Sequence, residues 1–500
     1  MPAEESGAFL AYHEPGIISI LTLLSFFFFL AVAEWLSHKI FRAGLIGQII
    51  VGLIYGVPIG NILVPEWQDT FLALGYIGLI LIVFEGGLTI RLDLLRQNFL
   101  LSVVAALLGV LTPIALSFAL LYRGFGYGAI ETFIIGTALC STSLGTTFIV
   151  ISSASKMVDF SQTRIGTVLV SAAILDDVCG LVLVSVIHQL RGIADGNGGD
   201  LDWIIGRPIL ASGLLGLLTP LAAKFVLGPL FRRFAEARFA QFKYVSNIVL
   251  MVLVLSAFLA VASYAGASVL LGAFLAGTLL SSLPSKHAEG PFVVLDREHG
   301  ETALGKSPTF IHTFEKYISD AQRYVFQPLF FASIGFAIPF RELWTGEAIW
   351  KGLVFTILMV CGKLVVGLCV PAWELITSMR RSQRPEKGGR STAASSWAPA
   401  TLLGTAMVAR GEIGLLIIQI GLNETPYLSR KAFVIGVWAI VLNTIIGPVS
   451  VGVLLKRMGN RIAQDESWGV QAKRDVSDAE LTVMDRALNG LSDDLPHNPS

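Results

Sequence analysis

The chain has 500 residues, of which 54% are hydrophobic and only 14% are charged, and its mean hydropathy is +0.70. Soluble domains carry about 25% charged residues. The composition therefore excludes an ordinary soluble enzyme, a nucleic-acid-binding protein and a disordered chain. Its 36 basic and 36 acidic residues leave a formal net charge of zero. These values predict an all-α protein that crosses a membrane many times.

Apolar segments of membrane-spanning length recur along the chain. A helix needs about 20 apolar residues to cross the hydrocarbon layer. We identify thirteen candidate spans, at 17–36, 44–60, 70–90, 99–122, 128–152, 165–188, 204–231, 244–264, 266–282, 324–340, 350–373, 399–421 and 432–455. They predict a first membrane half at 17–282, a polar loop at 283–323, a second membrane half at 324–456 and a disordered tail at 457–500.

The basic residues are distributed unevenly between the connections. Lysine and arginine are concentrated in the connections that follow odd-numbered spans. Because cytoplasmic loops carry the excess of positive charge, this pattern places residues 1–16 outside and the C-terminus in the cytoplasm. The pattern does not distinguish a plasma membrane from an organelle membrane.

Two pairs of spans resemble each other. The second span (GQIIVGLIYGVPIG) is similar to the ninth (LLGAFLAGTLLSSLP), and the third (LILIVFEGGLTIRLDLL) is similar to the tenth (PLFFASIGFAIPFREL). The offset is an odd number of spans, so the two copies would enter the membrane from opposite sides. Inverted repeats are typical of transporters with a site near the midplane. The alternative is a chance similarity between glycine-rich apolar helices.

A few ionisable residues lie near the centres of the spans. Charge at this depth is costly and by default marks a functional site. The residues are Asp176 and Asp177 in span 165–188, Lys363 in span 350–373, and Arg410 with Glu412 in span 399–421.

The adjacent aspartates suggest cation chemistry. Neighbouring residues on a helix project about 100° apart. One carboxylate can therefore pair with Lys363 while the other faces a cavity and holds a hard monovalent cation, which prefers oxygen ligands. Desolvation and a second carboxylate both favour the protonated form of an aspartate, so this group could exchange a proton for a cation. A purely structural ion pair is the alternative.

Span 128–152 contains the polar cluster STSLGTT at 141–147, which includes Thr142 and Ser143. Such a cluster can let a helix unwind and expose oxygen ligands, although small residues also form helix-packing faces. Gly411 and Gly414 suggest a matching break in span 399–421.

Arg410 is expected in a supporting role. It could neutralise the dipole of a helix C-terminus, or pair with Glu412 or Glu85. We expect Glu85, near the end of span 70–90, to be solvated or to cap a helix.

These segments resemble the cation:proton antiporters, and in particular the sodium/hydrogen exchanger family with its bacterial-type paired-aspartate members. The matching motifs are AILDDVCGL, STSLGTT, CGKLVVG and ARGEIGLL, with VFEGGL and FFASIGF as a further repeat-related pair. The similarity covers about residues 17–456. It implies broken crossing helices, a core domain from spans 4–6 and 11–13, and a dimerisation domain from most other spans.

The resemblance also implies residue roles. Asp177 would be the main cation and proton carrier, Asp176 would pair with Lys363, and Thr142 and Ser143 would lie at the helix crossing, with Asp177 and Thr142 as the cation ligands. Two features depart from the pattern. Some relatives have an aspartate in place of Ser143, and VFEGGL resembles the electroneutral branch, whose ion-binding helix usually carries Asn-Asp. Stoichiometry therefore stays open.

The expected function is that of a secondary transporter rather than an enzyme. It would exchange protons for Na⁺, or for K⁺ or Li⁺, by alternating access, and so support pH homeostasis. Its partners would be these ions, the lipid bilayer and a second copy in a homodimer, with no cofactor and no nucleic acid.

Other classes fit the sequence less well. A sodium-coupled symporter of an organic solute would share the inverted-repeat plan. An intramembrane aspartyl protease needs two aspartates that share one water, which adjacent residues on one helix cannot easily do. A potassium channel is disfavoured because no filter motif such as TVGYG is present.

Overall fold

The computed structural model describes residues 14–90, 98–143, 163–194, 201–235, 244–284, 309–381, 396–465 and 468–469. Within these ranges the chain forms helices and no β-strand. Eight helical segments are long and apolar enough to cross a membrane: Ile17–Phe41, Pro65–Thr89, Phe99–Gly124, Arg164–Leu190, Ile205–Phe234, Tyr244–Ala265, Gly346–Thr377 and Arg430–Gly459. The predicted class, an all-α polytopic membrane protein, is confirmed. The count of thirteen spans stays a prediction.

The helices follow one another along the chain with short connections. In the first half they are α1 (Ile17–Phe41), α2 (Gly44–Tyr55), α3 (Pro65–Thr89), α5 (Phe99–Ser117), α6 (Ala129–Ala138), α8 (Arg164–Ala194), α9 (Leu201–Ala222), α10 (Gly228–Leu230), α12 (Tyr244–Ala265) and α13 (Val269–Ser282). In the second half they are α15 (Phe310–Tyr317), α16 (Ser319–Ala321), α17 (Gln327–Phe336), α18 (Phe340–Leu343), α19 (Gly346–Gly367), α20 (Cys369–Arg381), α21 (Trp397–Ala406), α22 (Glu412–Glu424) and α23 (Arg430–Ala463). Short π-helical segments extend or join them: η1 (Phe118–Gly124), η3 (Ala223–Leu227), η4 (Phe231–Ala235) and η5 (Gln322–Phe326).

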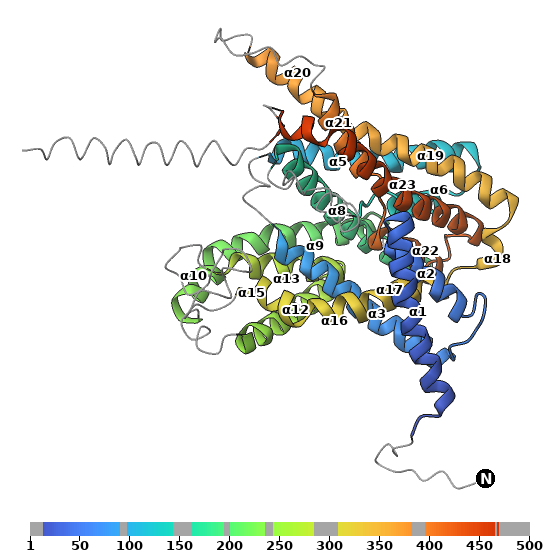
Figure 1. Ribbon diagram of the computed structural model, residues 1–500. Coiled ribbons are helices and arrows are strands. Elements are labelled where there is room, and N and C mark those ends of the chain that lie inside the picture. Colours follow the sequence, from blue (N-terminus) through green and yellow to red (C-terminus); the bar gives the residue numbers. More distant parts are fainter. Residues whose placement is uncertain are drawn as a thin grey trace, which may run out of the picture.

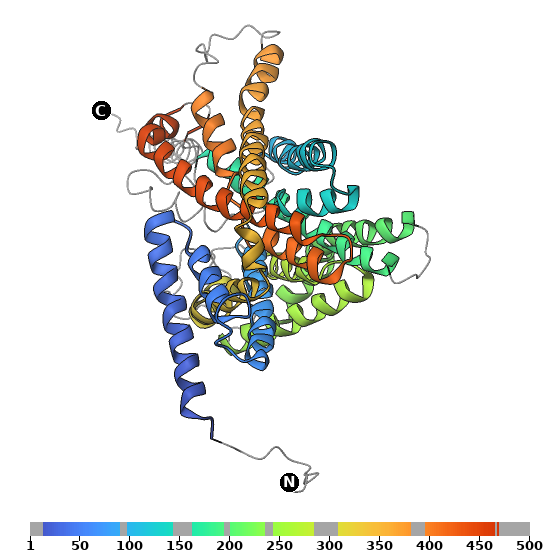
Figure 2. The same ribbon diagram turned by 90° about the vertical axis from the view of Figure 1, so that its right-hand side faces the viewer.

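The helices pack in two groups (Figures 1 and 2). One group contains α5, α6, α8 and α19 to α23, and within it α5 packs against both α8 and α19. The other contains α2, α3, α12, α13 and α17, with α1 packed on α2. Helix α9 runs along α8 and also contacts α12 and α13. The charged residues at mid-span depth all belong to the first group.

Glycines bring the helices of the second group into close contact. A Cβ at Gly52 of α2 would overlap the backbone of Ala332 in α17, and a Cβ at Gly87 of α3 would overlap the Phe274 carbonyl in α13. Small residues allow such close approach between helices in a membrane. Helix α2 thus pairs with α17, and α3 with α13. This reciprocal pairing is what an inverted repeat would produce, and it supports that prediction.

Two spans are interrupted. Helix α6 ends at Ala138, and residues 139–143 follow without helical structure. The rest of the predicted polar cluster, Gly145, Thr146 and Thr147, lies outside the described residues. In the second half, α21 ends at Ala406 and α22 begins at Glu412. The interruption predicted from Gly411 is therefore present, at 407–411.

Two segments differ from the sequence-based expectation. Part of the predicted polar loop at 283–323 is helical, since α15 buries Phe310 and Phe314. The predicted tail at 457–500 also begins with structure, because α23 continues to Ala463 and Trp468 is fully buried. Both segments are polar on average, and a mean hydropathy hides the few apolar side chains that one face of a short segment buries.

The adjacent glycines of α3 provide a test of this packing. Gly87→Ala should lower the stability of the folded protein by about 1–3 kcal/mol, because the added methyl overlaps the backbone of α13. Gly86→Ala is the matched control, since its Cβ meets nothing within 4 Å, and it should be neutral or slightly stabilising. Thermal unfolding of the detergent-solubilised protein measures both variants. Equal melting temperatures for the two would contradict the close contact.

Candidate functional site

Helix α8 carries the two aspartates near its middle. Asp176 is fully buried, whereas Asp177 is partly exposed. The helix is long and apolar, and it packs against α5, α9 and α22. The two neighbouring carboxylates therefore point into different surroundings, as their angular offset requires.

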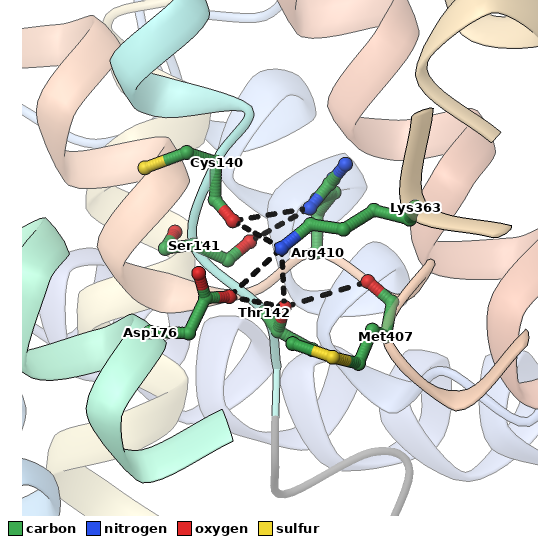
Figure 3. Close-up of polar contacts among 7 residues, drawn as sticks. All are labelled: Cys140, Ser141, Thr142, Asp176, Lys363, Met407 and Arg410. Carbon is green, nitrogen blue, oxygen red and sulfur yellow. Dashed lines mark hydrogen bonds and ion pairs between the residues drawn. The ribbon is translucent and has the colours of Figure 1, made fainter. Parts of the chain in front are cut away.

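Lys363 of α19 reaches Asp176 (Figure 3). Its Nζ donates to Asp176 Oδ2 at 2.8 Å, and both side chains are fully buried. The same ammonium donates to Thr142 Oγ1 at 3.0 Å and to the carbonyl oxygen of Cys140. The Thr142 hydroxyl donates in turn to Asp176 Oδ2. All three ammonium donors thus have an acceptor, which is the condition for burying a charged pair.

Gly109 of α5 leaves the space in which this pair lies. A Cβ at Gly109 would stand 3.3 Å from Lys363 Nζ and 3.4 Å from Asp176 Oδ1. The sequence analysis did not select Gly109. Its only signal is a glycine inside the apolar span 99–122, which has several explanations.

The two interrupted helices cross beside the ion pair. The Ser143 backbone N–H donates to the Ala409 carbonyl oxygen at 2.9 Å. Gly411 lies directly against Ser143, and a Cβ there would come within 2.6 Å of the Ser143 Cβ. The Thr142 hydroxyl lies 3.4 Å from the Met407 carbonyl oxygen. Thr142 and Ser143 therefore both lie at the crossing.

Arg410 closes the crossing from the other side. It is fully buried, and its Nη1 donates to the carbonyl oxygens of Ser141 at 3.1 Å and Cys140 at 3.4 Å. These carbonyls lie just beyond the C-terminal end of α6, where the helix dipole is negative. Among the partners considered from the sequence, Arg410 therefore lies at a helix end. Glu85 is placed elsewhere, where its Oε2 accepts a 2.7 Å hydrogen bond from Gln322.

Asp177 keeps an oxygen without a protein partner. The Thr142 backbone N–H bonds to the Asp177 carboxylate, but Asp177 Oδ1 has no hydrogen-bond partner among the described residues. Glu412, the first residue of α22, is partly exposed and is among the charged groups around Asp177. If Asp176, Asp177, Glu412, Lys363 and Arg410 are all ionised, the site carries one net negative charge.

This charge suits a singly charged ligand. In the part of the chain that the structure describes, no three histidine, cysteine, aspartate or glutamate side chains converge as the ligands of one metal ion. The arrangement instead offers one accessible carboxylate beside hydroxyl and carbonyl oxygens. A proton or a monovalent cation at Asp177 would neutralise the excess charge.

The fold and this site define a helical membrane protein with two interrupted helices that cross beside a buried ion pair. Residues 23–457 match the family described as "Sodium/hydrogen exchanger, transmembrane". Because this match covers most of the chain, the protein belongs to the sodium/hydrogen exchanger family.

Individual relatives agree with this assignment. The chain is 26% identical over 438 residues to a Na⁺/H⁺ antiporter of Enterococcus hirae, covering 85% of this chain and 95% of the relative. It is 26% identical over 415 residues to the Na⁺/H⁺-K⁺ antiporter GerN of Bacillus cereus, covering 83% and 90%. Its fold resembles the structure of the sodium proton antiporter MjNhaP1 from Methanocaldococcus jannaschii, with a TM-score of 0.59 and 18% identity over 88% of this chain and 98% of that one.

A double-substitution experiment tests the ion pair. Lys363→Met should destabilise the protein by about 3–5 kcal/mol, because it leaves the Asp176 carboxylate buried without a cation. Adding Asp176→Asn should restore a large part of that loss, since no charge then remains unpaired. The measurement is thermal unfolding in detergent. Additive losses in the double variant would show that the two side chains do not interact.

Proposed function

We propose that this protein is a secondary active antiporter that exchanges protons for monovalent cations across a membrane, with Asp177 as the carrier of both. The carrying observation is the division of labour between the two aspartates. Asp176 is fully buried and occupied by Lys363 and Thr142. Asp177, next to it, is partly exposed and has an oxygen without a protein partner.

The ligands around Asp177 are oxygens, as a hard cation requires. The Asp177 carboxylate and the Thr142 hydroxyl would hold the cation, and Ser143 would shape the site at the crossing. A proton bound to Asp177 removes the negative charge that attracts the cation. The two ions therefore compete for one carboxylate, which couples their movements without a cofactor.

The remaining charged residues would support this site. Lys363 neutralises Asp176 and so leaves Asp177 as the titrating group. Arg410 stabilises the exposed carbonyls at the end of α6. Glu412 adds negative potential near Asp177 and favours cation entry. Glu85, which bonds Gln322 of η5, would act in the contact between α3 and η5 rather than at the ion.

Transport would follow from a movement of the helix group that holds the site against the group built from α2, α3, α12, α13 and α17. Two inverted repeats give such proteins two related states that open to opposite sides. We place the N-terminus outside and the C-terminus in the cytoplasm, because lysine and arginine are concentrated in the corresponding connections. A homodimer is the expected assembly.

The competing functions lack support. A protease would need the two aspartates to share one water, but Asp176 Oδ2 is bonded by Lys363 and Thr142. A solute symporter has no counterpart among the relatives described above, which carry antiporter names.

Asp177→Asn is the direct test. The amide keeps the size of the side chain but can exchange neither a proton nor a charge, so cation-dependent proton movement should fall to the level of vesicles without protein. The assay is dequenching of a pH-sensitive dye in proteoliposomes after addition of Na⁺, K⁺ or Li⁺ in turn. Asp320→Asn, at an exposed position of α16, is the control and should keep the activity. Normal exchange by Asp177→Asn would refute the assignment.

Competition at one carboxylate also predicts a pH dependence. As the pH falls, protons occupy Asp177 more often, so the apparent KM for the cation should rise by up to tenfold per pH unit while the maximal rate at saturating cation changes less. Initial rates over a matrix of pH and Na⁺ concentration measure this effect. An apparent KM that is independent of pH would indicate separate sites for the two ions.

A further inference from the structure

The chain beyond α23 returns to the helix that carries the aspartates. Asp465, Trp468 and Gly469 lie beside the first turn of α8. Trp468 is fully buried and belongs to an apolar cluster with Ile165 of α8 and Val370 of α20. The site described above uses none of these residues.

Backbone hydrogen bonds attach this segment to α8. The Arg164 N–H donates to the Gly469 carbonyl oxygen at 3.1 Å, and the Ile165 N–H donates to the Trp468 carbonyl oxygen at 3.2 Å. The first N–H groups of a helix have no partner within the helix itself. Here, two of them are satisfied by residues about 300 positions later in the chain.

The Trp468 side chain extends the attachment to two further helices. Its Nε1 donates to Glu374 Oε1 of α20 at 2.7 Å. The Arg164 guanidinium lies 4.8 Å from the centre of the Trp468 ring, an attractive cation–π geometry. Arg164 Nε also donates to Asn98 Oδ1 at 3.1 Å, just before α5. Trp468 therefore connects α8 to α20 directly, and α5 joins the contact through Arg164.

These are the helices that form the buried ion pair. Helix α8 carries Asp176, α19 carries Lys363 and continues almost directly into α20, and α5 carries Gly109. Eleven residues separate Ile165 from Asp176, and eleven separate Lys363 from Glu374. Each interval corresponds to about 16 Å along a helix. The same two helical segments are thus joined at two levels, by the ion pair at one and by Trp468 at the other.

We propose that Trp468 is a positioning residue for cation and proton exchange, an inference that rests on the function proposed above. By joining the first turn of α8 to α20, it sets the axial position of α8 relative to α19. That position places Asp177 relative to the Thr142 hydroxyl, which is held on the Lys363 side of the site. A site whose supporting residues are loosened binds its ligand less well.

The test compares variants that break different parts of the contact. Trp468→Ala should raise the apparent KM for Na⁺ by about 3- to 10-fold, the order expected for one or two lost hydrogen-bond equivalents, and should shift the pH profile of exchange. Glu374→Ala should act in the same direction, whereas Glu374→Gln keeps an acceptor oxygen and should retain the wild-type profile. The assay is the proteoliposome exchange measurement at a series of pH values.

Two shortened chains separate Trp468 from the residues that follow it. A chain that ends at Ala463 should reproduce Trp468→Ala. A chain that ends at Ala472 keeps Trp468 and Gly469 and should match the full-length protein. If both shortened chains change exchange equally, the effect belongs to the last residues and the positioning role is refuted.

Hydrogen–deuterium exchange provides a readout that does not depend on transport. The amides of Arg164 and Ile165 should exchange faster in Trp468→Ala than in the wild type, because their acceptors are released. Faster exchange together with an unchanged apparent KM and pH profile would show that the contact only fastens the chain, and would overturn the positioning role. Absence of cation-dependent proton movement in the wild type would instead refute the proposed function, while the amide result would still report the contact.

Discussion

The buried ion pair between Asp176 and Lys363 is the interaction on which the site depends. Removing a carboxylate and an ammonium from water costs several kcal/mol for each group. The cost is offset only because Asp176 Oδ2 accepts from both Lys363 and Thr142, and because the ammonium has three acceptors. These partners come from α8, α19 and the segment after α6. The pair therefore determines how three distant parts of the chain meet.

The same pair explains why its neighbour is available for chemistry. Asp176 cannot leave its partners without stranding two buried charges. Asp177 projects in another direction from the same helix, is partly exposed, and keeps an oxygen without a protein partner among the described residues. A fixed charge next to a free one gives a site that has one net negative charge and one place to neutralise it. This is the simplest basis for exchange of a proton for a monovalent cation.

The crossing of the interrupted helices supplies the rest of the surroundings. Unwound backbone is tolerated at membrane depth only where protein groups satisfy it. Here, Ser143 bonds the Ala409 carbonyl, and Arg410 bonds the carbonyls after α6. The Thr444 hydroxyl donates in turn to the Arg410 carbonyl at 2.8 Å, which ties the crossing to α23. Because α23 leads to Trp468, the crossing and the far end of α8 are held by the same C-terminal part of the chain.

The sequence by itself determined the class of protein and the depth of its unusual charges. Backbone groups in lipid must be satisfied within helices, so apolar segments of span length indicate the architecture, and the position of Asp176, Asp177, Lys363 and Arg410 within their spans gives their shared level. Only the tertiary structure decided which aspartate pairs with Lys363, that Gly109 makes room for the pair, that Arg410 lies at the end of α6 rather than beside Glu85, and that Trp468 contacts α8. Sequence position measures height along a helix, whereas these contacts depend on how each helix is rotated and on which helix lies beside it, and packing between segments hundreds of residues apart determines both.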